Sequence, residues 1–187
     1  MTAGEDVRLA VWALAALWVL WTVPVLALRT RSKGVERAHT ANYSWIGLVL
    51  QTASYPLVFL FRGAQFGWVR GTLALLCGLG SLWLMWTAIP VLGKQWRLAA
   101  GVNVDHQLVQ SGPYGIVRHP IYTSMLGLLL ASGFLITPWW PFTVSLGIFA
   151  IGTWIRVDAE EKLLTQHFGK AFEEYRRRVP AILPWIW

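Results

Sequence analysis

The fold is decided by residues 121–155, which read IYTSMLGLLLASGFLITPWWPFTVSLGIFAIGTWI. This stretch holds two apolar runs, 121–137 and 139–155, and neither run contains a charged residue. The connection around Pro138 is short enough only for a tight helical turn. A bilayer core of about 30 Å takes about 20 apolar residues as a helix. The pattern therefore predicts a pair of antiparallel membrane helices.

Three further apolar runs precede this pair, at residues 7–28, 43–61 and 68–92. The composition agrees, because 56% of the 187 residues are hydrophobic and only 13% are charged. Soluble domains carry about 25% charged residues, so the composition argues against a soluble enzyme. We expect an all-α polytopic membrane protein, a single domain of about five transmembrane helices with a cytoplasmic C-terminal helical cap.

The basic residues predict the orientation of the chain. With the N-terminus outside, the inner side holds 13 Lys and Arg residues and the outer side holds three, Arg8, Arg62 and Arg70. Basic residues collect on the cytoplasmic side of membrane spans, which places segments 93–120 and 156–187 there. The net charge of +7 then reflects a membrane surface, and we expect lipids and no nucleic acid as partners. The Trp-rich, Ala- and Leu-rich style favours a bacterial inner membrane.

Segment 105–122, DHQLVQSGPYGIVRHPIY, is the first group of polar residues that could carry chemistry. Residues 111–115 read as a turn, and Pro120 suits the first turn of the following helix. Arg118 and His119 then lie at the N-terminal mouth of that helix, where free backbone N–H groups and two basic side chains make an anion site. The alternative is that both side chains only anchor the chain at the membrane interface.

The second group is Arg156, Asp158, Glu160 and Glu161. Arg156 and Glu160 are four residues apart and share one helical face. They make either a simple ion pair or a polar pair that holds a zwitterionic ligand at the membrane border. The single Cys77 and the spacing of the four histidines predict no metal site. No glycine-rich dinucleotide or phosphate loop is present.

These motifs together resemble the isoprenylcysteine carboxyl methyltransferase family, and in part the phospholipid methyltransferases. The resemblance covers about residues 93–185. It rests on Leu108-Val-x-Ser-Gly-Pro-Tyr-x-x-Val-Arg-His-Pro-x-Tyr122, the tight hairpin, Arg156-x-x-x-Glu160-Glu161, Phe168-Gly169, Tyr175 and Arg178-Val-Pro180.

The resemblance implies S-adenosylmethionine as the cofactor and Arg156 as the catalytic residue that faces an acceptor carboxylate. The residues implied to bind the cofactor are His106, Gln107, Leu108, Val109, Tyr114, His119, Pro120, Ile121, Tyr122 and Glu160. Some family members also carry a Gln several residues before the position of His106. This sequence reads Ala99-Ala100-Gly101 there, and Gln95 has a different register.

The implied reaction is methyl transfer to a lipophilic acceptor that enters from the bilayer. The acceptor implied is the C-terminal carboxylate of an isoprenylcysteine or a similar lipophilic acid. Three alternatives stay open. One is a phospholipid or amine methyltransferase, for which Asp158 would suit the acceptor. Another is an NADPH-dependent membrane reductase of the sterol type. The third is a non-enzymatic membrane protein, against which the scarcity of charges within the spans argues.

Overall fold

The computed structural model describes residues 3–29, 37–40, 43–61, 63, 67–93, 101–103 and 107–184. Within them the regular secondary structure is helical apart from one two-stranded antiparallel ribbon. The elements are α1 (Ala3–Arg29), β1 (Arg37–Thr40), α2 (Ser44–Leu60), α3 (Trp68–Leu92), β2 (Gly101–Asn103), the 3-10 turn η2 (Gly112–Gly115), α4 (Pro120–Ile136), α5 (Trp139–Phe168) and α6 (Lys170–Arg178).

The observed helices follow the apolar runs closely. The bounds of α3 are those predicted, and α2 and α4 differ from prediction by one residue at each end. Two differences are larger. Helix α1 begins at Ala3 instead of residue 7, and α5 continues 13 residues past its predicted membrane segment, to Phe168. Charged residues do not end a helix by themselves, so α5 leaves the apolar region and stays helical.

Three of these helices are long and apolar enough to cross a membrane, with candidate spans at Arg8–Ala27, Trp68–Leu92 and Trp139–Phe168. Helices α2 and α4 are apolar but have only 17 residues each. Large apolar side chains point outward along the long helices, among them Leu75, Leu76 and Leu79 on α3. An exposed apolar surface of this kind is typical of an integral membrane protein.

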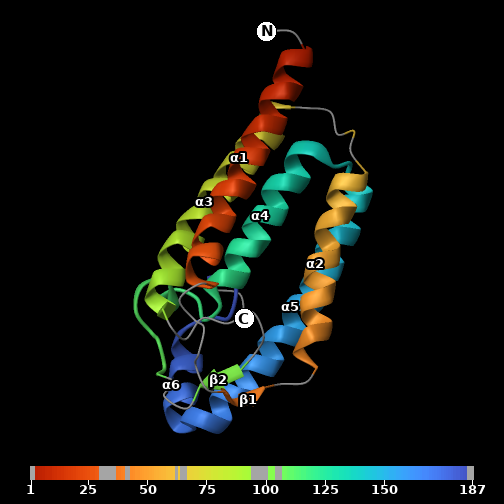
Figure 1. Cartoon of the computed structure of the whole chain (residues 1–187). Helices are drawn as coiled ribbons and strands as arrows, with labels where there is room; N and C mark the ends of the chain where they lie inside the picture. Colours follow the sequence, from red (N-terminus) through yellow and green to blue (C-terminus); the bar gives the residue numbers. More distant parts are fainter. Residues whose placement is uncertain are drawn as a thin grey trace.

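The helices lie side by side, with α2 along α5, α3 along α4, and α1 against α3 (Figure 1). The α4–α5 turn lies at the same end as the start of α1. Helix α6 and the ribbon lie at the opposite end (Figure 1). We call this second end, with η2, the start of α4 and the last turns of α5, the polar end.

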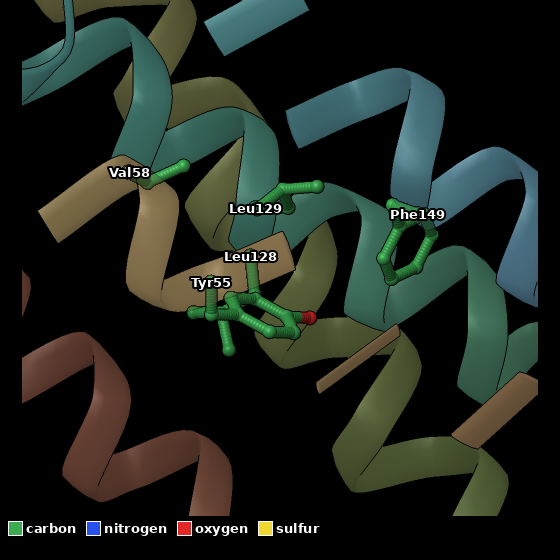
Figure 2. Close-up of a cluster of buried hydrophobic side chains, with 5 residues drawn as sticks. All are labelled: Tyr55, Val58, Leu128, Leu129 and Phe149. Atoms are coloured by element: carbon green, nitrogen blue, oxygen red, sulfur yellow. The ribbon is translucent and has the colours of Figure 1, made fainter. Parts of the chain in front are cut away.

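A buried cluster in the middle of the bundle joins three helices (Figure 2). Tyr55 and Val58 come from α2, Leu128 and Leu129 from α4, and Phe149 from α5. The Tyr55 hydroxyl donates to the carbonyl of Met125 at 2.9 Å, which satisfies its polar atom inside the core. The cluster fixes α2 against the α4–α5 pair.

Polar side chains also tie neighbouring helices together. Gln51 Nε2 donates to Thr153 Oγ1 at 2.8 Å between α2 and α5, and Ser81 Oγ donates to the Ser124 carbonyl at 2.6 Å between α3 and α4. In membrane proteins such bonds contribute about 0.6 kcal/mol each. They fix the register of the helices more than they add stability.

Helices α2 and α5 approach most closely at two glycines. A Cβ atom on Gly152 would lie 2.8 Å from the Gly47 carbonyl oxygen, and one on Gly47 would lie 2.6 Å from Arg156 Cγ. Small residues permit such close backbone contact between helices. The packing therefore presses α2 directly against the stem of Arg156.

Arg70 holds the opposite end of the bundle. Its guanidinium donates to the carbonyls of Phe134 at 2.7 Å, Gly133 at 3.0 Å, and Thr137. Gly133 and Phe134 lie in the last turn of α4, where the helix leaves carbonyls without partners; Gly133 also accepts from the Thr137 N–H at 3.1 Å. A cation placed there also offsets the negative end of the helix dipole.

Candidate active site

The two polar segments meet at the polar end, as the sequence predicts. Gly169, with φ of +55°, ends α5 and turns the chain into α6. The backbone N–H groups of Arg118 and His119 donate to the carbonyls of Pro180 and Ala181 at 2.8 and 2.9 Å. The residues that follow α6 are thereby joined to the start of α4.

Tyr175 adds a side-chain contact to this junction. Its hydroxyl donates to the Tyr114 carbonyl at 2.6 Å, which connects α6 with η2. Burial raises the pKa of Tyr175 to about 12, so the hydroxyl keeps its proton and remains a donor. Phe172 and Tyr175 are both buried, so this face of α6 packs onto the rest of the chain.

Both sequence interpretations of Arg118 and His119 need correction. Neither residue is an exposed interface anchor, because the two side chains are only 7% and 6% exposed. The backbone N–H groups of both residues donate to carbonyls of the protein itself, so these two groups are not available to an external anion. Their partners are the protein's own carboxylates, Glu160 and Glu161 of α5.

Glu161 is the centre of the first half of this network. Its Oε1 accepts from Arg118 Nη2 at 2.7 Å and Nε at 2.9 Å, and lies 3.3 Å from His119 Nε2. Its Oε2 lies 3.2 Å from Arg176 Nε of α6. Arg118 Nη1 also donates to the carbonyls of Arg176 and Val179, so this half holds α6 onto α5.

Glu160 is the centre of the second half. Its Oε1 accepts from the Tyr122 hydroxyl and lies 3.6 Å from Arg156 Nη2, and its Oε2 lies 3.4 Å from His119 Nδ1. Arg156 Nε donates to the Tyr122 hydroxyl at 2.8 Å. The predicted Arg156–Glu160 pair on one helical face is therefore present. Glu160 keeps 25% of its side chain exposed, whereas Arg156 keeps 5%.

His119 joins the two halves. Its ring stacks on Tyr122 with planes 8° apart and centroids 5.5 Å apart, and its two nitrogens face Glu160 and Glu161. Burial alone would lower the pKa of His119. The hydrogen bonds and negative charges of the two carboxylates outweigh burial, so the pKa is raised above its ordinary value of 6.5.

A cavity of about 580 Å³ lies beside the end of α3. Its lining consists of Val91, Gln107, Leu108, Val109, Gln110 and Ser111. Three predicted cofactor residues, the consecutive Gln107, Leu108 and Val109, are therefore among the residues that line this cavity. His106 and Gln95 lie outside the described residues.

Tyr114 carries a buried polar atom without a partner. Within the described part of the chain, its hydroxyl has no hydrogen bond. Burial, together with the charges of Glu160 and Tyr175, raises the pKa of Tyr114 well above its ordinary value. An orphaned buried hydroxyl costs stability unless a ligand completes it, which marks this position as a candidate contact.

The remaining predicted residues, Pro120 and Ile121, occupy the first turn of α4. Pro120 is buried at the first helical position, and Ile121 packs beside Met85 and Ile89 of α3. Sequence reasoning assigned no role to Arg176. It belongs to a run of three arginines, and nothing in that run distinguishes the one that faces Glu161.

The part of the chain that carries the site is similar to a known protein family. Residues 69–171 match the phospholipid methyltransferase family. The chain belongs to the phospholipid methyltransferase family. The matched residues contain the start of α4, all of α5 and therefore the whole Arg118–Glu161 network except Arg176.

Two similar proteins have names that state the methyl acceptor more specifically than the family description does. The chain is 32% identical to the protein-S-isoprenylcysteine O-methyltransferase of Schizosaccharomyces pombe, over 73% of this chain and 56% of that protein. It is 32% identical to protein-S-isoprenylcysteine O-methyltransferase B of Arabidopsis thaliana, over 70% of this chain and 66% of that protein. The chain thus spans between half and two thirds of these relatives.

A third relative carries a different acceptor in its name. The chain is 40% identical to methanethiol S-methyltransferase 2 of Bradyrhizobium diazoefficiens, over 38% of this chain and 26% of that protein. Membership in the phospholipid methyltransferase family therefore does not by itself identify the methyl acceptor.

Proposed function

We propose that the protein is an S-adenosylmethionine-dependent membrane methyltransferase that acts on a lipophilic carboxylate. The observation that carries the proposal is the network at the polar end. There, four basic groups face two carboxylates in a largely buried setting, and the basic groups are Arg118, His119, Arg156 and Arg176. A net positive, poorly hydrated site favours an anionic acceptor.

We further propose that all five helices α1–α5 cross the membrane and that the polar end is cytoplasmic. The alternating course of the helices places α6 and the start of α1 at opposite ends (Figure 1). The basic residues of α6, Arg176, Arg177 and Arg178, lie at the polar end, as expected of a cytoplasmic face. We propose that the chain forms a single membrane domain and that residues 93–120 and 156–187 are its catalytic segments.

The residues present fit S-adenosylmethionine. This cofactor combines an aromatic adenine with a ribose, an ammonium and a carboxylate. The cavity lining offers the apolar side chains of Leu108 and Val109 together with the polar side chain of Gln107. The orphaned Tyr114 hydroxyl offers a hydrogen bond, and the exposed quarter of Glu160 offers an acceptor for an ammonium or a ribose hydroxyl.

Arg156 is the residue we propose to orient the acceptor. It lies where the apolar part of α5 ends, so a substrate tail in the bilayer would bring its polar head to this depth. Its Nη2 is 3.6 Å from Glu160, a looser contact than the 2.7 Å between Arg118 and Glu161. Arg156 can therefore share its charge with a second carboxylate, the acceptor.

The chemistry needs no general base. An acceptor carboxylate with a pKa near 3.5 is already ionised at neutral pH. When bound, S-adenosylmethionine would supply an activated methyl group on a sulfonium, which is transferred to the acceptor oxygen while the sulfur leaves as a neutral thioether. The residues of the chain hold the acceptor oxygen in line, keep water out and neutralise the carboxylate before transfer.

An amine acceptor finds less support in the structure. Asp158, the residue that would suit an amine, accepts from Lys162 Nζ at 2.8 Å and from the Tyr43 hydroxyl at 3.0 Å. It therefore belongs to a separate, exposed contact between α2 and α5. The names of the S. pombe and A. thaliana relatives favour an isoprenylcysteine, or a similar lipophilic acid, as the acceptor.

Calorimetric titration of detergent-purified protein tests the cofactor. We expect binding of S-adenosylmethionine and of its demethylated product at micromolar concentrations, and no binding of NADPH. Binding of NADPH alone would assign the chain to a reductase. Binding of none of the three, by protein shown to be folded, would contradict enzymatic function.

A further inference from the structure

We propose that Glu161 is a positioning residue, which fixes His119 with both ring nitrogens protonated and so holds Glu160 in place without touching substrate or cofactor. The inference rests on the proposed function and assigns different roles to two adjacent carboxylates. Glu161 binds only side chains of the protein, whereas Glu160 faces the ligand.

The contacts of Glu161 carry the first step. Three cationic side chains, Arg118, His119 and Arg176, lie within 3.3 Å of its two oxygens. Its side chain is only 8% exposed, against 25% for Glu160. A carboxylate that is buried and surrounded by three donors has little capacity left for a ligand.

The geometry of His119 carries the second step. Its Nε2 lies 3.3 Å from Glu161 Oε1, and its Nδ1 lies 3.4 Å from Glu160 Oε2. A neutral imidazole has one N–H and can donate to only one carboxylate. Both contacts are donated only by the imidazolium, so His119 links Glu160 to Glu161 while it is protonated.

The other charged and titratable groups around His119 fix the direction of the effect. Arg118 precedes it in the chain, Tyr122 stacks on its ring, Arg156 lies beyond Tyr122, and Arg176 lies beyond Glu161. Loss of the Glu161 charge leaves these arginines next to His119, and the imidazolium loses one of its two anionic partners. His119 then releases its proton more readily, and Glu160 loses its donor.

The test uses Glu161→Gln, which keeps the size of the side chain, and Glu161→Asp, which keeps the charge. Exposed Glu173 of α6 supplies the matched control, Glu173→Gln. The first readout is the NMR titration of ¹⁵N-labelled histidine in detergent, with His119→Asn used to assign the signal. We expect Glu161→Gln to lower the titration midpoint of His119 by about one pH unit, and Glu161→Asp to restore most of it.

The second readout is calorimetric affinity for the demethylated cofactor. We expect about tenfold weaker binding by Glu161→Gln, with recovery in Glu161→Asp. An unchanged His119 titration midpoint in folded Glu161→Gln would overturn the proposal, because the residue would then only tie α6 to α5. Should wild-type protein bind no cofactor, the proposed function fails, while the titration still decides the role of Glu161.

Discussion

Arg156 Nε donates to the Tyr122 hydroxyl at 2.8 Å, and this bond joins the end of the apolar part of α5 to the first turn of α4. The same hydroxyl donates to Glu160. One phenol group therefore connects the residue proposed to orient the acceptor with the residue proposed to bind the cofactor.

Tyr122→Phe should impair the orienting of the acceptor by Arg156 while leaving the protein folded. The ring, its stacking on His119 and its burial remain, but Arg156 loses its fixed position. We expect the kcat for methyl transfer to fall about 10- to 100-fold, because small misplacements of a reacting group cost that much. The measurement is kcat and KM for the acceptor in folded protein.

Tyr55→Phe is the matched control, because it removes a buried hydroxyl that bonds to the Met125 carbonyl and makes no contact with Arg156 or Glu160 in the hydrogen bonds described. Its kcat should stay within about twofold of the wild type. A wild-type kcat in Tyr122→Phe would contradict the role given to the Arg156–Tyr122 bond.

Tyr114→Phe should move stability and affinity in opposite directions. The Tyr114 hydroxyl has no partner within the described residues, so its removal should stabilise the ligand-free protein by about 1 kcal/mol. Because we propose that the cofactor completes this hydroxyl, affinity for the demethylated cofactor should fall about fivefold. Thermal unfolding and calorimetry measure the two effects. Lower stability with unchanged affinity would show that the hydroxyl serves only the fold.

Gly152→Ala should disturb the contact between α2 and α5. The new Cβ would meet the backbone N of Gln51 and the carbonyl of Gly47, both at 2.8 Å, so the helices must separate. Overpacking of this kind costs about 1–3 kcal/mol. We expect a lower midpoint of thermal unfolding and a lower kcat, because Gly47 also packs against Arg156.

Gly147→Ala on the same helix is the control, since its Cβ would meet nothing within 4 Å. This variant should keep the wild-type unfolding midpoint or exceed it slightly. Equal effects of the two alanine substitutions would refute the importance of the close approach.

The stability of the protein should fall as the pH rises above neutral. The pKa of His119 is raised in the folded chain, so folding favours its protonated form. That contribution is fully present below the ordinary pKa of 6.5 and is lost as the pH rises through the raised value. Unfolding midpoints measured from pH 5.5 to 9 should show this decline.

In His119→Gln the decline above pH 6.5 should be weaker, whereas in His167→Gln, at an exposed position of α5, it should persist. A pH profile that is the same in His119→Gln and the wild type would remove His119 as its cause.

The helices were predictable because each apolar run has a length that only a membrane or a bundle core explains. The bounds of α3 show this most clearly, since Gly67 and Gly93 flank a largely apolar stretch in which Arg70 is the one charged residue.

The helix of the tail was predictable, because Leu163, Leu164 and Phe168 recur at helical spacing and Gly169 ends it. Its continuity with the membrane segment was not, because charge alone does not distinguish a helix beyond the bilayer from a loop. The ribbon of β1 and β2 pairs two short segments more than 60 residues apart, and neither has a strand pattern of its own.

The residues that form the site were predictable from the sequence, but the contacts between these residues were predictable only in part. The spacing of Arg156 and Glu160 gives their contact directly. The pairing of Arg118 with Glu161 spans 43 residues, and no local pattern encodes it. Arg118 and His119 therefore looked like a site for an external anion, although carboxylates of the protein itself occupy that place.

Transfer of a labelled methyl group from S-adenosylmethionine to a matched pair of acceptors tests the central claim most directly. One acceptor is an amine-blocked S-farnesylcysteine, and the other is the same molecule with its carboxylate converted to a carboxamide. We predict base-labile methyl ester on the carboxylate, none on the carboxamide, and loss of the ester in Arg156→Ala. Methylation of a thiol or of a phospholipid amine with no transfer to the carboxylate would contradict the proposed acceptor.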